Sequence, residues 1–187
     1  MSKIAFNPSR RQWLRGDTGA KRLPIRPPWS VAESAFIQDC SRCGDCIQQC
    51  PEAILIKGSG GFPEVDFQLG ECTFCGDCVA SCAAAVFNPV DTDPWSHKVA
   101  INERCITRQQ VVCRSCVEQC EPEAISLTMQ PGGVGTPVLN SDLCNGCGAC
   151  IAVCPTQAIS VQRAAYPDLN HPLPSHSTAT RPQETDN

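Results

Sequence analysis

Four short apolar segments recur along the chain, each directly after a cysteine. They read PEAILI at 51–56, AAAVF at 83–87, EPEAISL at 121–127 and PTQAISV at 155–161. Small residues followed by β-branched ones predict a short helical turn that leads into a brief strand. No single unit of this size can bury a core, so we expect the units to pack in pairs about a pseudo-twofold axis.

Polar, turn-rich connectors separate these segments. The connectors 58–66 and 130–142 each predict a hairpin that delivers a strand to the next unit, and 88–103 predicts the same arrangement. The last residues are rich in Pro, Ser, Thr, His and Asn and lack apolar periodicity, which predicts a disordered tail. The expected organisation is an arm at 1–30, four units at 31–60, 63–92, 96–128 and 135–162, and the tail at 163–187.

All sixteen cysteines lie in four groups that precede the apolar segments. Three groups share the spacing C-x2-C-x2-C-x3-C, which bacterial ferredoxins use to hold [4Fe–4S] clusters. The third group is stretched by the insertion ITRQQVV. The groups are Cys40, Cys43, Cys46 and Cys50; Cys72, Cys75, Cys78 and Cys82; Cys105, Cys113, Cys116 and Cys120; and Cys144, Cys147, Cys150 and Cys154.

The spacing follows from the geometry of the cluster. Each iron of a cubane needs one thiolate, and two-residue gaps let a tight loop supply three of them. Gly44, Gly76 and Gly148 follow the second cysteine of the regular groups and permit the backbone turn that this loop needs. The fourth cysteine ligates the other cluster in two-cluster ferredoxins. The groups could pair as one with two and three with four, or as one with four and two with three.

Two other uses of cysteine fit this pattern less well. Disulfide bonds form in oxidising compartments, and the sequence has no apolar signal-peptide segment. Structural zinc sites use C-x2-C pairs set well apart, whereas here the third and fourth cysteines follow at once. The pattern therefore predicts iron–sulfur clusters.

The stretched third group allows two interpretations. Either the cluster of this group has been lost and its thiols no longer bind metal, or the loop accommodates the insertion and binds a fourth cluster. All four thiols are present, and the segment CEPEAISL that follows matches the equivalent segments of the other groups. We predict four [4Fe–4S] clusters.

Composition indicates how the fold is stabilised. Only 5% of the residues are aromatic, so ligation must supply much of the folding free energy, and the iron-free chain is expected to be largely unfolded. The three histidines, His97, His171 and His176, are predicted to be solvated surface residues and not ligands.

Charge is divided unevenly between the arm and the rest of the chain. Residues 1–30 carry seven Lys or Arg against one acid, whereas the remainder carries eight basic and eighteen acidic residues, a balance of −10. Each oxidised cubane with four thiolates adds about −2. This balance argues against nucleic acid as a partner and favours a basic docking face on another protein.

The arm contains SRRQWLRG at 9–16, which is similar to a twin-arginine export motif. The stretch that follows is charged and Pro-rich, not apolar, and no window reaches the length of a membrane span. We therefore expect an arm that stays in the cytoplasm, with Arg10, Arg11 and Trp13 engaging a partner. A chance basic arm that docks on the body is the alternative.

Together, the SRR-bearing arm, the regular cysteine runs and the stretched run CITRQQVVCRSCVEQCEPEAI resemble the NapF family, the ferredoxin-type accessory proteins of the periplasmic nitrate reductase system. The resemblance covers residues 1 to about 162. It implies a cytoplasmic protein that associates with the molybdenum-containing catalytic subunit before export and assists its maturation by redox control or cluster supply.

The expected fold class is α+β, with tandem bacterial-type ferredoxin modules built of short strands, short helices and many loops. A rival function is an electron-transfer subunit of a multi-subunit oxidoreductase, and a freely shuttling ferredoxin ranks behind it. The sequence contains no nucleophile–base pair, phosphate loop or paired carboxylates, so we expect no enzyme active site.

Overall fold

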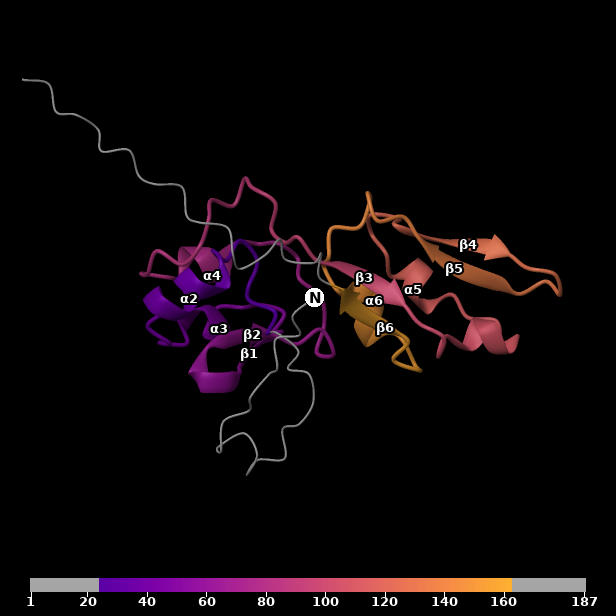
Figure 1. The fold of residues 1–187 in the computed structure, drawn as a ribbon, viewed down its shortest axis with the longest axis horizontal. Coiled ribbons are helices and arrows are strands. Elements are labelled where there is room, and N and C mark those ends of the chain that lie inside the picture. Colours follow the sequence, from indigo (N-terminus) through magenta and orange to yellow (C-terminus); the bar gives the residue numbers. More distant parts are fainter. Residues whose placement is uncertain (1–23, 163–187) are drawn as a thin grey trace, which may run out of the picture.

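The computed structural model describes residues 24–162, which form two halves lying side by side (Figure 1). The first half contains α2 (Glu33–Asp39), α3 (Asp45–Gln48), β1 (Leu55–Lys57), η1 (Ser59–Gly61), β2 (Pro63–Val65) and α4 (Asp77–Ala80). The second contains β3 (Lys98–Ile101), η2 (Ile106–Gln109), α5 (Ser115–Glu118), β4 (Ile125–Met129), β5 (Gly135–Leu139), α6 (Ala149–Ala152) and β6 (Ile159–Gln162). The predicted tail and residues 1–23 of the predicted arm lie outside the described residues.

The described strands form three two-stranded antiparallel sheets. β1 pairs with β2 and β4 with β5, so the hairpins predicted at 58–66 and 130–142 are present. The hairpin predicted at 88–103 is wrong. Its strand, β3, pairs instead with β6, with Ile101 opposite Ile159. This pairing joins the first and last segments of the second half and closes it into one unit.

The first half is closed at the equivalent place by a single bridge between Ser30 and Phe87. The Val31 N–H donates to the Val86 carbonyl at 3.0 Å. The segment 83–87 therefore contributes one bridge and not the strand predicted there. Pro89 follows almost at once, and because proline has no N–H to donate, it cannot extend the pairing.

The short helices lie inside the cysteine groups and not in the apolar segments that follow them. In each group a four-residue helix (α3, α4, α5 or α6) ends just before the fourth cysteine. None of the four apolar segments is helical: those at 51–56, 121–127 and 155–161 begin with a non-helical turn and 83–87 has only a bend, so the helical turn predicted within them is misplaced. In three of them this turn puts a non-glycine residue at positive φ: Ala53, Glu123 and Gln157. This shared turn is the structural form of the repeat.

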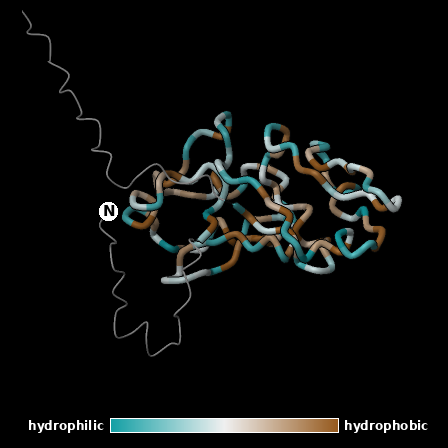
Figure 2. The backbone as a smooth tube through the Cα atoms, turned by 45° about the vertical axis from the view of Figure 1, so that its right-hand side comes forward, coloured by the Kyte–Doolittle hydropathy of each residue, from teal (hydrophilic) through white to brown (hydrophobic). Residues whose placement is uncertain are grey.

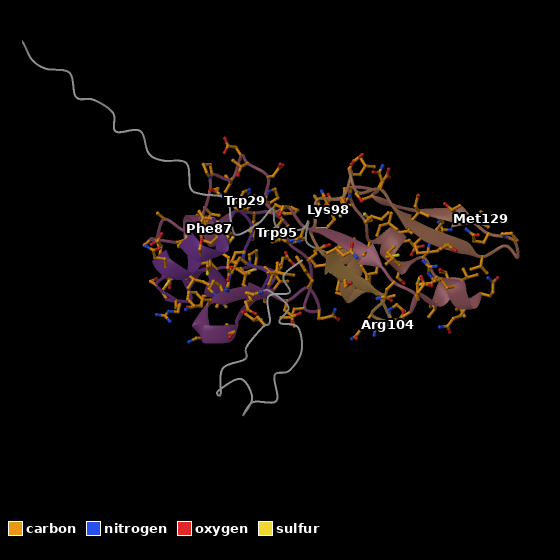
Figure 3. All side chains as sticks on the ribbon, viewed as in Figure 1. Trp29, Phe87, Trp95, Lys98, Arg104 and Met129 are labelled. Carbon is orange, nitrogen blue, oxygen red and sulfur yellow. The ribbon has the colours of Figure 1, made fainter. Side chains whose placement is uncertain are left out.

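Aromatic side chains gather where the two halves meet. Phe67 packs edge-on against Trp95 at a ring distance of 5.7 Å and against His97 at 5.8 Å. Trp95 also contacts Phe74. Phe67, Phe74 and Trp95 thus form an aromatic cluster at this junction, where Figure 3 labels Trp95.

His97 corrects a prediction made from the sequence. It is buried, with 4% of its surface exposed, and is not a solvated surface residue. Its Nε2–H donates to the Gly146 carbonyl at 3.0 Å. The sequence placed it in a polar connector, but the pairing of β3 with β6 draws that connector into the junction.

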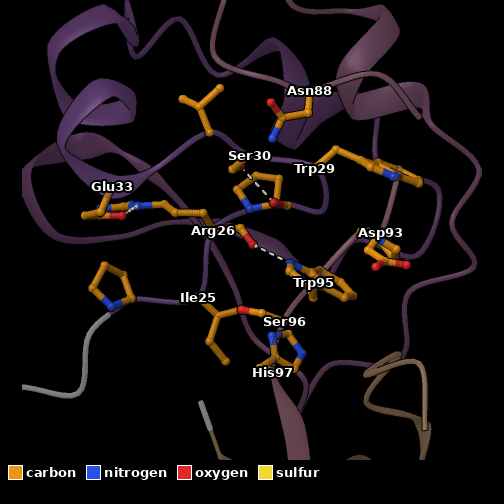
Figure 4. A pocket seen from close by; sticks show the side chains of 14 residues that line it. Ile25, Arg26, Trp29, Ser30, Glu33, Asn88, Asp93, Trp95, Ser96 and His97 are labelled. Atoms are coloured by element: carbon orange, nitrogen blue, oxygen red, sulfur yellow. Dashed lines mark hydrogen bonds and ion pairs between the residues drawn. The ribbon is translucent and has the colours of Figure 1, made fainter. Parts of the chain in front are cut away.

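The described end of the predicted arm is packed into the first half (Figure 4). The Arg26 guanidinium donates to both carboxylate oxygens of Glu33, at 2.6 and 2.9 Å, and lies over the Phe36 ring. Trp29 is 4% exposed, and its indole N–H donates to the Thr92 carbonyl at 2.9 Å. Residues from Arg26 onward therefore contribute to the core of this half.

Along residues 24–162, hydrophilic and hydrophobic residues alternate in short runs (Figure 2). Within residues 24–162 no helix is both long and apolar enough to cross a membrane.

Gly148 lies against the junction and allows a test of how closely the halves pack. A Cβ at Gly148 would lie 2.1 Å from a ring carbon of Phe67, whereas a Cβ at Gly44 would meet nothing within 4 Å. Both glycines precede a short helix with φ near +90°. Gly44→Ala should therefore cost only the left-handed backbone penalty, about 1–2 kcal/mol. Gly148→Ala should cost about 1–3 kcal/mol more, because overpacking is added.

Anaerobic urea unfolding of the iron-loaded protein, followed by visible absorbance, would measure both variants. Equal losses for Gly44→Ala and Gly148→Ala would show that Phe67 does not restrict the junction.

Candidate metal centres

The sixteen thiols are gathered into four sets of four, which we number by the group that supplies three of the cysteines. At sites two, three and four the four thiols line one small apolar cavity. At site one the other three thiols lie near enough to Cys46 for their negative charges to raise its pKa. Site one contains Cys40, Cys43, Cys46 and Cys82; site two contains Cys72, Cys75, Cys78 and Cys50; site three contains Cys105, Cys113, Cys116 and Cys154; and site four contains Cys144, Cys147, Cys150 and Cys120.

The fourth cysteine of each group lies with the other three of a neighbouring group. Cys50 lines the cavity of site two beside Cys72, Cys75 and Cys78. The helices α3 and α4 pack together, as do α5 and α6. Of the two pairings that the sequence left open, the structure has group one with two and group three with four.

The donor set fits a [4Fe–4S] cluster at each site. Each site offers four thiols with apolar neighbours, and each cubane iron takes one thiolate. No group of three His, Cys, Asp or Glu side chains in the described part of the chain could hold a single metal ion. A cubane differs in this respect, because its four thiolates bind four separate irons and need not converge on one point.

Burial decides the protonation state of these thiols before metal binds. Burial first, and then neighbouring thiolates, raises the pKa of Cys78 and Cys150 to about 12. The same causes raise the pKa of Cys46 to about 11. Since only the thiolate is a ligand, these sites must release protons when they are loaded.

The two halves meet through the cysteine loops themselves. The backbone N–H of Cys72, in site two, donates to the carbonyl of Cys147, in site four, at 2.9 Å. Site one adjoins site two within the first half, and site four adjoins site three within the second. The four sites therefore follow one another in the spatial order one, two, four, three.

The loop of site four also accepts hydrogen bonds from β3 and the residue before it. Lys98 Nζ donates to the Cys144 carbonyl at 2.5 Å, and His97 donates to the Gly146 carbonyl. Neither contact was expected from the sequence, because β3 was predicted to pair elsewhere.

Site three contains hydroxyl groups that the sequence analysis missed. Thr107 Oγ1 lies 3.3 Å from the Cys105 sulfur, Ser115 Oγ lies 3.7 Å from the Cys113 sulfur, and Thr156 Oγ1 lies 3.8 Å from the Cys154 sulfur. In each case the hydroxyl residue stands two positions after the cysteine. Cys-x-Ser/Thr was therefore the available signal, and these three cysteines are the only ones in the chain that have it.

All predicted ligands lie in the described residues, and the structure brings them together in fours. The predicted partner-binding residues Arg10, Arg11 and Trp13 lie outside the described residues, so their role stays a prediction.

Comparison with known proteins extends this picture. The family model for a 4Fe-4S dicluster domain matches residues 39–86, which contain groups one and two, and that for a 4Fe-4S binding domain matches residues 137–160, around group four.

Curated relatives match over most of the chain. It is 50% identical to the ferredoxin-type protein NapF of Haemophilus influenzae over 165 residues, covering 83% of this chain and 94% of that protein. It is 44% identical to the ferredoxin-type protein NapF of Escherichia coli K12, covering 85% of this chain and 97% of that protein. The ferredoxin-type protein NapG of Escherichia coli K12 is 31% identical, covering 72% of this chain and 68% of that protein. The chain therefore belongs to the NapF family of ferredoxin-type iron–sulfur proteins.

Proposed function

We propose that the chain is a cytoplasmic protein with two α+β ferredoxin modules and four [4Fe–4S] clusters, which assists the maturation of the periplasmic nitrate reductase catalytic subunit before export. The assignment of all sixteen cysteines as ligands is part of this proposal. The observation that carries it is the gathering of the thiols into four sets, each completed by a cysteine from the neighbouring group.

Each module would bind two clusters, and the two cysteine groups of a module would share the ligands. Three thiolates from one loop and a fourth from the paired group would hold each cluster, which supplies one-electron chemistry when bound. Because the paired loop completes each site, loss of one site weakens the packing of its neighbour.

The link to nitrate reductase rests on the NapF relatives and on charge. The chain outside the first thirty residues has a balance of −10, and bound clusters make it more negative. A partner with a basic surface would be attracted to this body, while the basic arm with Arg10, Arg11 and Trp13 would engage an acidic or aromatic patch. The protein would act on the catalytic subunit by redox control or by cluster supply.

The spatial order of the sites favours a second candidate, an electron-transfer subunit of a multi-subunit oxidoreductase. A conducting subunit needs sites that adjoin one another, as these do. Purification from cells separates the two: a permanent subunit elutes with its complex at fixed stoichiometry, whereas a maturation protein is absent from the finished enzyme.

Deleting residues 2–15 tests the proposed contact with the catalytic subunit. Iron content should be unchanged, because every proposed ligand lies at Cys40 or beyond. The affinity of the truncated protein for the immature catalytic subunit should be at least about tenfold lower, which corresponds to about 1.4 kcal/mol of binding free energy. Raised salt should weaken binding by the intact protein more than binding by the truncated protein. Anaerobic titration calorimetry would measure both effects.

The double variant Arg10→Gln with Arg11→Gln is the matched control, because it removes two positive charges and keeps Trp13. Its affinity for the catalytic subunit shows how much of the arm's contribution comes from charge and how much from the aromatic side chain. Unchanged affinity after the deletion would remove the arm from the interface. No binding by the intact protein would contradict the proposed partner.

A further inference from the structure

Site three differs from the other sites in the hydrogen bonds made to its sulfurs. Three hydroxyls, from Thr107, Ser115 and Thr156, lie within hydrogen-bonding range of three different sulfurs. The Ala158 backbone N–H also donates to the Cys154 sulfur, at 3.2 Å. Backbone N–H groups also donate to sulfurs of the other sites, among them Phe74 to Cys72 at 3.4 Å, Ile47 to Cys46 and Ala149 to Cys147. The side-chain hydroxyls are therefore what distinguishes site three within residues 24–162.

The direction of the hydroxyl contacts is fixed once metal is bound. A ligating cysteine is a thiolate and has no proton to donate, so each hydroxyl must be the donor. Thr107 is 2% exposed, which means that its hydroxyl has no alternative partner in bulk water. It lies in η2, formed by the insertion that stretches the third group. The insertion thus places a donor on the displaced cysteine, Cys105.

The equivalent positions of the other sites carry different chemistry. Two residues after the second cysteine, site three has Ser115, whereas sites one and two have the carboxylates Asp45 and Asp77 and site four has Ala149. A carboxylate adds negative charge beside the cluster, a hydroxyl adds a donor and an alanine adds neither.

The residue two positions after the fourth cysteine repeats this contrast. Site three has Thr156, while site two has the carboxylate of Glu52, site one has Ala84 and site four has Pro122. Site three therefore has a donor at both positions, and site two has a negative charge at both.

Hydrogen bonds to the sulfurs and net charge are two of the factors that set the reduction potential of a cluster. Reduction adds one electron without forming or breaking a bond. Donors aimed at the sulfurs stabilise the added negative charge, and nearby carboxylates oppose it. Both differences act in the same direction, toward easier reduction at site three.

We propose that site three is the electron-collecting end of the row of sites, with the highest reduction potential of the four, and that Thr107, Ser115 and Thr156 tune it through their bonds to the sulfurs. This inference rests on the proposed occupancy of all four sites. Site three stands last in the order one, two, four, three, so an electron from a one-electron donor protein would come to rest there, and the step from site two to site four, across the junction between Cys72 and Cys147, would be energetically downhill.

Anaerobic redox titration monitored by EPR tests the proposal on the full-length, iron-loaded protein. Cys113→Ser first identifies the signal of site three. That signal should appear at the highest potential in the unaltered protein. Thr107→Val and Thr156→Val, which keep the shape and remove the donor, should each make reduction of that site about tenfold less favourable, or about 59 mV for one electron.

Two matched variants control the result. Thr73→Val makes the same change in the cysteine loop of site two, where the Thr73 hydroxyl makes no hydrogen bond to a sulfur of the described residues, and should shift no signal. Thr107→Ser keeps the hydroxyl donor, so the reduction potential of site three in this variant should match that of the unaltered protein and not that of Thr107→Val. Asp77→Ser should raise the potential of site two, which tests the charge argument without altering site three.

An intact site-three signal whose potential is unchanged in both valine variants would overturn the proposal and leave the proposed function standing. So would a site-three signal that is not the first to be reduced. If Cys113→Ser removes no signal and no iron, site three is empty, and the four-cluster assignment fails with it.

Discussion

Removing iron from the protein should unfold most of residues 24–162. The described helices of the cysteine groups are four residues long, and the strands are three to five residues long. Isolated helices and two-stranded hairpins of this length are at best marginally stable in water. The main hydrophobic cluster itself includes the ligand candidates Cys46, Cys78, Cys144 and Cys150. Without metal these positions lose the bonds that hold the loops together.

Anaerobic chelation under reducing conditions, followed by circular dichroism and amide hydrogen exchange, would measure this effect. We expect loss of nearly all strand signal and of amide protection in β4 and β5. Cys113→Ser is a partial control, because it should weaken the second half and leave the first half protected. An iron-free chain with native dichroism and protected strands would show that the protein core alone stabilises the fold.

Replacing single cysteines should reveal ligand sharing between groups. Cys43→Ser and Cys82→Ser should alter the same EPR signal, that of site one, although the two residues belong to different groups. The single variants Cys50→Ser and Cys75→Ser should likewise alter one and the same signal, that of site two. The reason is geometric: the short helix before the fourth cysteine carries it toward the paired loop.

EPR of the reduced variants, with iron analysis of each, would separate the possibilities. If Cys43→Ser and Cys50→Ser removed one and the same signal, each group would hold its own cluster and the crossed arrangement would be wrong. Glu52→Gln, next to the Cys50–Pro51 turn but not a ligand candidate, should keep every signal.

Local features of the fold were accessible from the sequence. The spacing of the cysteines reflects the size of a cubane, and glycine- and proline-rich connectors at 58–66 and 130–142 correctly predicted two hairpins. Both features are determined by residues close together in the sequence, so they can be predicted without knowledge of the tertiary structure. The placement of helical turns failed because the apolar segments were interpreted without regard to the cysteine loop before them.

Long-range features could not be predicted in the same way. Nothing in the connector 88–103 indicates that β3 pairs with β6, more than fifty residues away, and the burial of His97 follows from that pairing. The choice between the two pairings of the groups likewise depends on tertiary packing. The hydroxyls of site three were visible as Cys-x-Ser/Thr, but their meaning became clear only when Cys154 was found beside Cys105 and Cys113.

The central claim, four clusters held by sixteen cysteines, is tested most directly by iron and acid-labile sulfide analysis of anaerobically purified protein, combined with Mössbauer spectroscopy. We predict about sixteen irons and about sixteen sulfides per chain, all in [4Fe–4S] form. About twelve of each would mean that one site is empty. Stoichiometric zinc without visible absorption would contradict the claim.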